Sequence, residues 1–388
     1  MKIAWITRAA AYTGGAERHI ADVVSLLAER GASNYLLYEL DAPMDSAFVS
    51  LFSGAFPQVE LARQLEFLAP DVIYVHQVSG RRTLEVLADT GIPSLRFFHD
   101  HAPFCLHVHK YTTIGHRSCS RVLGPYCSFP CLGPVNRRSG FPPVSLRTLG
   151  AARAELRANM RLNACAVGSV HMKDHLVAHG FPPAAVRVLP MFTKLPDQDP
   201  PVERERGLLL FVGALLRGKG LDVLLSALAR LGPECRLRVA GSGHQEGMFR
   251  EQAARLGVAE RVEFLGRIGR SELDTQYRAA SCVVVPSREP ETFGLVGLEA
   301  FRHATPVVAS RVGGIGDWLL EGKTGYGFPS GDAEGLAAVL RRLLDDPVAA
   351  LATGRAGREL LLACFTPERH ATALMDLLGI VIRSRGQS

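Results

Sequence analysis

Glu289-Pro-Glu291-Thr-Phe-Gly294-Leu-Val-Gly-Leu-Glu299-Ala is the stretch that indicates the fold of this chain most directly. It follows the apolar run Cys282-Val-Val-Val-Pro286-Ser287, which is typical of a buried strand. A helix that begins near Gly294 would leave its first amides unpaired and its N-terminus positive, which favours a diphosphate there. Glu291 on the loop would bind sugar hydroxyls, and Glu299 inside the helix would hold a ribose diol. The pattern therefore predicts a pocket for a nucleotide sugar.

The same stretch resembles the donor-site signature of the retaining glycosyltransferases of family 4, and the resemblance continues along the chain in that family's order. Its other pieces are Gly14-Gly15-Ala-Glu17-Arg-His, Phe211-Val-Gly213-Ala-Leu-Leu-Arg217-Gly-Lys219-Gly220, Val239-Ala-Gly241-Ser-Gly243, Val262-Glu-Phe-Leu-Gly266, Phe301-Arg-His-Ala-Thr-Pro306-Val-Val-Ala-Ser310, Gly313-Gly314 and Glu321-Gly-Lys-Thr-Gly325. Each piece alone is weak, since two carboxylates at a helix start are often just solvated, but the ordered set is specific. The resemblance implies the α/β GT-B fold, in which two Rossmann-like domains face each other across a cleft.

Strand-like and helix-like segments alternate along the 388 residues, which favours two domains with parallel sheets. The first series fills residues 1–190, and a stretch rich in proline and charge, 191–206, is typical of a linker. The second series, 207–366, is expected to bind the nucleotide sugar at the carboxyl ends of its strands. By resemblance, residues 367–388 form a helix that crosses back to the first domain.

Lys219 is the residue that we expect to neutralise the diphosphate leaving group as its charge develops. It follows the strand expected at 208–212 and would face the same crevice as the acidic loop. The family pattern has an arginine where this chain has Ala214. Arg217 would reach the same phosphate from three residues further on, or one positive contact is missing. The alternative for Lys219 is a surface lysine before a glycine turn.

Two further positions come from the first domain. Gly14 and Gly15 lie between strand and helix, where side chains would block the approach of the backbone to a phosphate. His99 follows the strand expected at 94–98, and the resemblance places it near the donor sugar and the acceptor. The expected catalytic residues are thus His99, Lys219 and Glu291. The remaining donor-binding positions are Gly241, Arg267 and Ile268, whose loop would pair with the base, and Phe293, Gly294 and Leu295 at the helix start.

The resemblance implies transfer of a sugar from a UDP- or GDP-sugar to an acceptor hydroxyl with retention of anomeric configuration. The acceptor would be a glycan, a lipid-linked saccharide or a small molecule, in polysaccharide, lipid-linked saccharide or glycoconjugate synthesis. No cofactor is expected for catalysis, because the one Asp-x-Asp pattern, Asp197-Gln-Asp199, falls in the linker. Two alternatives stay open. One is a GT-B sugar-nucleotide epimerase or phosphorylase, and the other is a non-catalytic scaffold, which Ala214 favours slightly.

An irregular, cysteine-rich insertion is expected at about 102–138. A loop of this length in a compact domain needs a staple. Disulfides are disfavoured in a cytoplasmic chain, which leaves a structural zinc ion bound by thiolates as one interpretation. Only one pair has a usual spacing, so unligated thiols are the open alternative and an iron–sulfur cluster a weaker one. The proposed zinc ligands are Cys105, Cys119, Cys127 and Cys131, or three of them with His107, His109 or His116.

Composition describes an ordinary globular protein, with 47% hydrophobic and 21% charged residues. Between residues 101 and 163, nine lysines and arginines stand against one acid, Glu155. The stretch from Arg147 to Arg161 has helical spacing and would lie on an anionic membrane, or is simply a solvated basic face. Nucleic acid is not an expected partner, because no interleaved aromatics or binding module accompany the charge. Without a signal peptide or membrane span, we expect a cytoplasmic protein, with peripheral contact to the inner face of the membrane as an option.

Overall fold

The computed structural model describes residues 1–78, 80–112, 115, 117–137, 144–196 and 203–384. The chain divides into two compact units, each described here by itself. The first unit comprises Met1–Val108, Ser120–Met191 and Pro367–Ser388. The second comprises His109–Cys119 and Phe192–Thr366, so that part of the cysteine-rich insertion belongs with the second unit. Six residues of the expected linker, 197–202, lie outside the described part.

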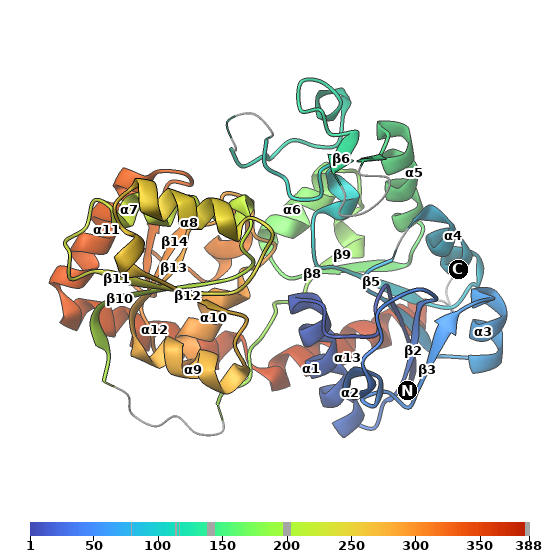
Figure 1. Ribbon diagram of the computed structural model, residues 1–388. Helices are drawn as coiled ribbons and strands as arrows, with labels where there is room; N and C mark the ends of the chain where they lie inside the picture. The colour runs from blue at the N-terminus through green and yellow to red at the C-terminus, as the bar shows by residue number, and fades with distance from the viewer. Residues whose placement is uncertain (79, 113–114, 116, 138–143, 197–202, 385–388) are drawn as a thin grey trace. The chain divides into compact units, whose positions relative to one another are not determined.

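The first unit is built on a parallel sheet with the strand order β3-β2-β1-β4-β5-β8-β9 (Figure 1). The strands are β1 (Lys2–Thr7), β2 (Ser33–Glu39), β3 (Gly54–Gln58), β4 (Val72–Val75), β5 (Ser94–Phe98), β8 (Ala164–Val167) and β9 (Val186–Val188). The helices are α1 (Gly15–Glu29), α2 (Ser46–Val49), α3 (Leu61–Leu68), α4 (Arg81–Asp89), α5 (Leu149–Asn159), α6 (Val170–Ala178) and α13 (Pro367–Ser384). Strands β4 and β5 are buried along their whole length, as expected for a sheet that helices cover on both faces.

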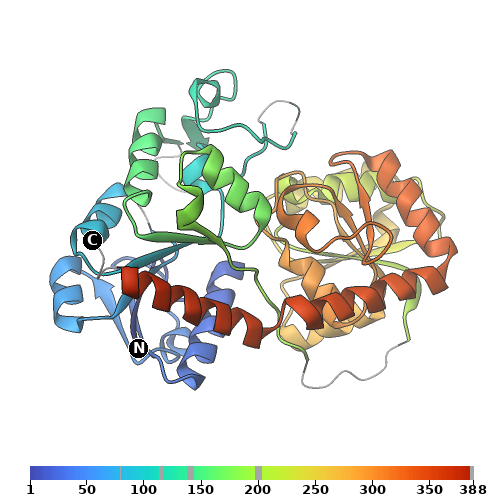
Figure 2. The same ribbon diagram turned by 180° about the vertical axis from the view of Figure 1, so that it is seen from behind.

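The last helix, α13, belongs to the first unit although it ends the chain. It packs on α1 and on the edges of β4 and β5, and Figure 2 shows it beside α1. The side chains that it buries repeat at helical spacing, which gives α13 one continuous apolar face. They are His370, Ala371, Leu374, Leu377, Leu378 and Val381.

The second unit has a six-stranded sheet with the order β12-β11-β10-β13-β14-β15. The strands are β10 (Glu205–Val212), β11 (Arg236–Ala240), β12 (Val262–Gly266), β13 (Ala280–Val285), β14 (Val307–Ser310) and β15 (Tyr326–Phe328). The helices are α7 (Leu221–Leu228), α8 (Glu246–Arg255), α9 (Arg270–Ala279), α10 (Leu295–Arg302), α11 (Ala333–Asp345) and α12 (Pro347–Cys364). Strand order reverses between β10 and β13, and ligands of such sheets bind beyond the carboxyl ends of the strands at that point.

The part of the insertion in the first unit is held by a small apolar cluster. Short 3-10 turns at Ala102–Phe104 and Pro125–Cys127 and a hairpin of β6 (Val135–Arg137) and β7 (Val144–Leu146) make up its regular structure. Leu106 and Leu123 are buried against Ala152 of α5. The Arg147 side chain donates hydrogen bonds to the carbonyl oxygens of Ala102 (2.7 Å) and Cys105 (3.3 Å). Apolar contacts and the hydrogen bonds of Arg147 therefore hold this part of the loop in place.

Candidate functional site

One ammonium group lies between two carboxylates where the loops after β10 and β13 meet. Lys219 Nζ is 2.7 Å from an oxygen of Glu289 and 2.9 and 3.1 Å from the two oxygens of Glu291. The Ser287 hydroxyl donates a further hydrogen bond of 2.5 Å to Glu291. These are the two strand ends at which the sheet order reverses. Two residues predicted from separate motifs, Lys219 and Glu291, are therefore brought into direct contact at the expected place.

The charges of this trio do not balance, since one cation faces two anions. Burial disfavours the ammonium, but Glu291 and Glu289 outweigh it and raise the pKa of Lys219 above its ordinary value. Burial also raises the pKa of Glu289, with a further contribution from Glu291, while Lys219 opposes the shift. Lys219 is thus firmly charged, and burial makes the Glu289 carboxylate easier to neutralise than an exposed carboxylate would be. Sequence analysis did not select Glu289, although it stands two residues before Glu291.

A glycine lets the lysine loop approach the strand. Gly220 has a positive φ of 75°, and a β-carbon at this position would lie 1.8 Å from the carbonyl oxygen of Pro286. The preceding glycine carbonyl, Gly218 O, accepts hydrogen bonds from the backbone amides of Arg288 (2.8 Å) and Glu289 (3.1 Å). The sequence Gly-Lys-Gly is therefore required to hold Lys219 against the acidic loop.

Helix α10 begins directly after the acidic loop. Its N-cap is Gly294, which has a left-handed φ of 86°, and Leu295 is the first helical residue. Phe293 is buried, and its carbonyl oxygen accepts a hydrogen bond of 2.7 Å from the indole of Trp318. The ring of Phe293 is thus part of the core. A ligand at this helix start would meet backbone amides near Gly294 and Leu295 and not the Phe293 side chain.

Glu299 lies on α10 with one carboxylate oxygen 2.7 Å from the hydroxyl of Tyr277, which donates the hydrogen bond. Burial and the neighbouring Glu299 raise the pKa of Tyr277, so this phenol stays protonated. No sequence motif points to Tyr277, but its hydroxyl orients Glu299, the carboxylate predicted to bind ribose. Its position three residues after Asp274 on α9 places both side chains on the face toward α10.

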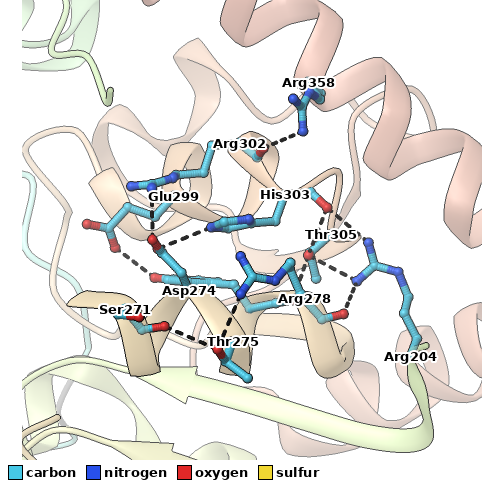
Figure 3. Close-up of polar contacts among 11 residues, drawn as sticks. Arg204, Ser271, Asp274, Thr275, Arg278, Glu299, Arg302, His303, Thr305 and Arg358 are labelled. Carbon is cyan, nitrogen blue, oxygen red and sulfur yellow. Dashed lines mark hydrogen bonds and ion pairs between the residues drawn. The ribbon is translucent and has the colours of Figure 1, made fainter. Parts of the chain in front are cut away.

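A polar network fixes α10 on its neighbours (Figure 3). Asp274 accepts from the buried Arg302 at 3.0 Å and lies 3.2 Å from the ring nitrogen Nε2 of His303. Arg204 donates to the Thr305 hydroxyl and to four backbone carbonyl oxygens, at distances of 2.8 to 3.2 Å. The four carbonyls belong to Arg278, Ala280, His303 and Ala304. Together these contacts hold the C-terminal end of α10, the helix that carries Glu299.

The other predicted positions of the second unit lie on loops at the same sheet edge. Gly241 N donates to Gly266 O at 2.8 Å, which joins the loops after β11 and β12. In the second of these loops Arg267 is exposed and Ile268 is half-buried. Arg217 is turned toward α8, where its guanidinium lies 3.1 Å from the sulfur of Met248. A phosphate contact from Arg217 stays a prediction.

The predicted glycines of the first unit lie at the start of α1. Gly14 is the N-cap and Gly15 the first helical residue, and both are exposed. Beyond its chain neighbours and its own helix backbone, no atom of the described residues lies within 4 Å of the position that a β-carbon of Gly15 would take. The helix start is therefore open, as a close approach of phosphate to the backbone requires.

His99 belongs to a cluster of four histidines that sequence analysis did not foresee. His19 of α1, His76 after β4 and His370 of α13 join it, with neighbouring ring centroids 5.0 to 5.8 Å apart. Burial lowers the pKa of every member, to about 3 for His99 and about 4 for His370. All four rings are therefore neutral at pH 7. One signal was available for His76, since it follows β4 just as His99 follows the neighbouring parallel strand β5.

The contact between two of these rings fixes their tautomers. His76 Nδ1 lies 2.7 Å from His99 Nε2, so one of these nitrogens carries the proton and donates. His76 Nε2 is buried and has no hydrogen-bond partner among the described residues. Because buried N–H groups are rarely left unpaired, we assign the proton of His76 to Nδ1. His99 then accepts at Nε2 and carries its own proton on Nδ1, as a hydrogen-bond donor.

The four cysteines of the insertion do not form a metal-ligand group in the described part of the chain, where no three His, Cys, Asp or Glu side chains gather suitably. All four are half-buried. Cys119 belongs to the second unit, and the other three belong to the first. Structural zinc at these thiols stays a prediction, which metal analysis of the purified protein would test.

Comparison with known proteins supports the sequence analysis. Residues 196–360 match the family of glycosyl transferases group 1. Glycogen synthase of Mycobacterium tuberculosis is 39% identical over 168 residues, which are 42% of this chain and 40% of that enzyme. D-inositol 3-phosphate glycosyltransferase of Streptomyces avermitilis is 38% identical over 180 residues, 43% of this chain and 38% of that enzyme. The matches thus span about two fifths of the length of these curated relatives.

Solved structures resemble the whole chain. Anabaena HepE in complex with UDP-glucose has a TM-score of 0.71 at 19% identity, covering 98% of this chain and 99% of that one. Sucrose-phosphate synthase from Thermosynechococcus elongatus has a TM-score of 0.73 at 22% identity, covering 99% and 100%. At these identities the likeness shows the fold alone. The predicted GT-B fold is confirmed, and residues 196–360 are similar to the glycosyl transferases group 1 family.

Proposed function

We propose that this protein is a retaining glycosyltransferase that moves a sugar from a UDP- or GDP-sugar to an acceptor hydroxyl. The observation that carries the proposal is the contact of Lys219 with Glu291 beside the start of α10, with Glu299 further along the same helix. A cation and free helix amides suit a diphosphate, and the two carboxylates suit hydroxyls on either side of it. The names of relatives that act on sugars, and of HepE bound to UDP-glucose, agree with this chemistry.

The reaction would take place mainly through positioning and charge stabilisation. The acceptor attacks on the face from which the diphosphate leaves, and a phosphate oxygen takes the acceptor proton. Lys219 stabilises the negative charge that develops on the leaving group. Glu291 holds sugar hydroxyls, Glu299 holds the ribose, and the Nδ1–H of His99 donates to an oxygen of the sugar or acceptor. Nothing in this scheme calls for a metal ion.

Entry of the donor must rearrange the trio, because Glu289 and the diphosphate compete for the same ammonium. Burial raises the pKa of Glu289, and we expect this carboxylate to protonate or turn away. Glu291 keeps its hydrogen bond from Ser287 and stays in place to meet the sugar.

The experiment that tests the donor site is a thermal-shift panel of UDP, GDP and ADP, each with and without common sugars. A ligand that binds only the folded state raises the melting temperature. We expect one nucleotide class to do so, and Glu299→Ala to abolish the shift while Glu272→Ala, an exposed glutamate on α9, retains it. Turnover should be lost in Lys219→Ala and kept in Lys323→Ala, an exposed lysine of the same unit. A full panel without any shift would contradict the proposal and favour a scaffold.

We propose that the protein is cytoplasmic. We also propose that its acceptor is a glycan, a lipid-linked saccharide or a small molecule. Among the helices of the described residues, none has the length and apolar character needed to cross a bilayer. Arg153 and Arg157 of α5 are exposed and available to an anionic surface. Arg147 is not, because it pairs with Glu155 at 3.0 Å within the unit. Flotation with anionic vesicles at low and high salt tests this contact, and Arg153→Ala with Arg157→Ala should remove it.

A further inference from the structure

A small pocket in the first unit lies at the carboxyl ends of β4 and β5, and its volume is about 60 Å³. A water molecule needs about 10–15 Å³ on this scale, so the pocket has room for about four waters or one small oxyanion. Its polar lining residues are Arg8, His76, Gln77, Arg96, His99, Asp100 and Glu155.

Arg96 is the feature that distinguishes this pocket. It comes from β5 and is only 5% exposed, yet its Nε and Nη1 atoms have no hydrogen-bond partner among the described residues. Its guanidinium lies over the ring of Phe98 at 5.2 Å. Burial lowers the pKa of Arg96 to about 10, although Asp100, Cys165 and Glu155 oppose the shift. The side chain is therefore still a cation at pH 7, and it lacks hydrogen bonds that a buried charge needs.

The two carboxylates that line the pocket are engaged with other groups. Asp100 accepts a hydrogen bond of 2.8 Å from the backbone amide of Ala102. Glu155 pairs with Arg147 at 3.0 Å. A second cation, the exposed Arg8, lines the same pocket, and the two histidines are neutral. Asp100 and Glu155 act on Arg96 through their charge, but its Nε and Nη1 donors still lack hydrogen-bond acceptors among the described residues.

We infer that this pocket binds a small oxyanion, the phosphate group of a phosphorylated acceptor. A phosphate offers several acceptor oxygens to the planar guanidinium of Arg96, which suits a forked contact, and Arg8 adds charge at the edge. His99 lines the same pocket, so an anchored acceptor would lie beside a predicted catalytic residue. The identity of the bound group as part of the acceptor rests on the proposed function, whereas the binding of an oxyanion does not.

The first test is a thermal-shift and calorimetric titration of the full chain with inorganic phosphate, against chloride at equal ionic strength. We expect phosphate to bind the wild type, Arg8→Ala to weaken binding about fivefold, and Arg96→Met to abolish it. Arg63→Ala, an exposed arginine elsewhere in the unit, should bind normally. Arg96→Met should melt no lower than the wild type without phosphate, because it replaces an unpaired buried charge by an apolar side chain. If Arg96→Met does not fold, Arg96→Lys is the second variant. It keeps the positive charge but cannot make the forked contact, so it should bind phosphate at least tenfold more weakly than the wild type.

Two outcomes would overturn the anion site: no binding of phosphate by the wild type, or full binding by both Arg96 variants. Loss of phosphate binding in Glu299→Ala would also overturn it, because the anion would then sit at the donor site. The acceptor assignment has its own test, in which phosphorylated and dephosphorylated sugars compete for transfer. The wild type should prefer the phosphorylated acceptor at least tenfold and Arg96→Lys should not. If phosphate binds and this preference is absent, the pocket holds free phosphate. If no nucleotide shifts the melting temperature but phosphate does, the proposed function fails and the pocket stands.

Discussion

Glu289→Gln is the change that tests most sharply how the donor enters the site. In the ligand-free protein, Lys219 lies 2.7 Å from Glu289 and 2.9 Å from Glu291, so the trio carries one net negative charge. Glutamine keeps the size of the side chain and a hydrogen-bond acceptor for Lys219, and it removes one charge. The net charge that an incoming diphosphate meets therefore changes from −1 to zero.

The size of the effect follows from Coulomb's law. Two like charges about 6 Å apart repel by about 3 kcal/mol at an effective dielectric constant of about 20. The side chains of Glu289 and Lys219 are 19% and 28% exposed, so solvent screens part of this energy. About 1 kcal/mol should remain, which is about fivefold tighter binding of the donor. Turnover should change less than affinity, because Lys219 and Glu291 are intact.

The assay is calorimetric titration of the intact nucleotide sugar, whose diphosphate stays ionised from pH 5 to 8. Wild-type affinity should increase as the pH falls toward the raised pKa of Glu289, because the protonated side chain no longer repels the donor. Glu289→Gln should bind tightly at all these pH values. Glu263→Gln, which removes a carboxylate from the ion pair with Arg238 on β11, is the matched control and should behave as the wild type. If Glu289→Gln binds the donor more weakly than the wild type, Glu289 is a ligand of the donor and not a competitor.

Four further predictions concern the histidines (two of them), the carboxylate expected to bind ribose, and the arginine that holds α10. His76→Phe should lower kcat about tenfold or more with little change in donor KM, since His99 loses the bond that fixes its tautomer. His76→Asn, which can donate from a similar position, should restore part of the rate, and failure of both variants to change kcat would refute the assignment. The buried histidines should also make the first unit acid-labile: their folded-state pKa values are lowered, so the unfolded chain binds more protons and stability falls as pH drops below about 6.5. Urea titrations at pH 7.5 and 5 measure this loss, which should be smaller in His76→Phe. Tyr277→Phe should weaken nucleotide binding about threefold to tenfold by removing one hydrogen bond that orients the Glu299 carboxylate, and thermal shift with the bound nucleotide measures it. Arg204→Lys should cost on the order of 3 kcal/mol of unfolding free energy in chemical denaturation, because one ammonium cannot reach all the acceptors on the two segments 278–280 and 303–305.

Sequence patterns predicted the strand ends of this protein better than they predicted the partners of the side chains there. Continuous apolar runs such as 282–285 mark buried parallel strands, and alternation with helices then fixes where the loops gather. That reasoning placed Lys219 and Glu291 at one sheet edge, and the structure shows them in contact. It did not select Tyr277 or Arg204, because a helix residue and a linker residue acquire these roles only through packing over 22 and about 100 positions of sequence.

In the cysteine-rich insertion, the sequence pattern pointed to a metal ion and did not point to the contacts that hold the loop. Its four cysteines suggested a bound metal ion because they stand close together in a long irregular loop. In the described residues, the loop is held by Leu106, Leu123 and the two carbonyl contacts of Arg147. Apolar residues and a single arginine have no characteristic spacing, so a sequence does not reveal that they hold a loop. Cysteine pairs that bind zinc do have such a spacing.

The two halves of the donor site differ in how tightly they are held, and this difference has a functional reason. Glu299 is fixed by Tyr277 on a helix that Asp274 and Arg302 tie down, whereas the ammonium of Lys219 contacts two carboxylates. Ribose hydroxyls are neutral, so they bind most favourably to a carboxylate that is already held in position. Ordering a mobile carboxylate on binding would cost entropy. A diphosphate carries its own charge and can displace a carboxylate from an ammonium. Carboxylates that a diphosphate can displace therefore neutralise the lysine before the donor binds. The same lysine can then stabilise the leaving group when its charge develops.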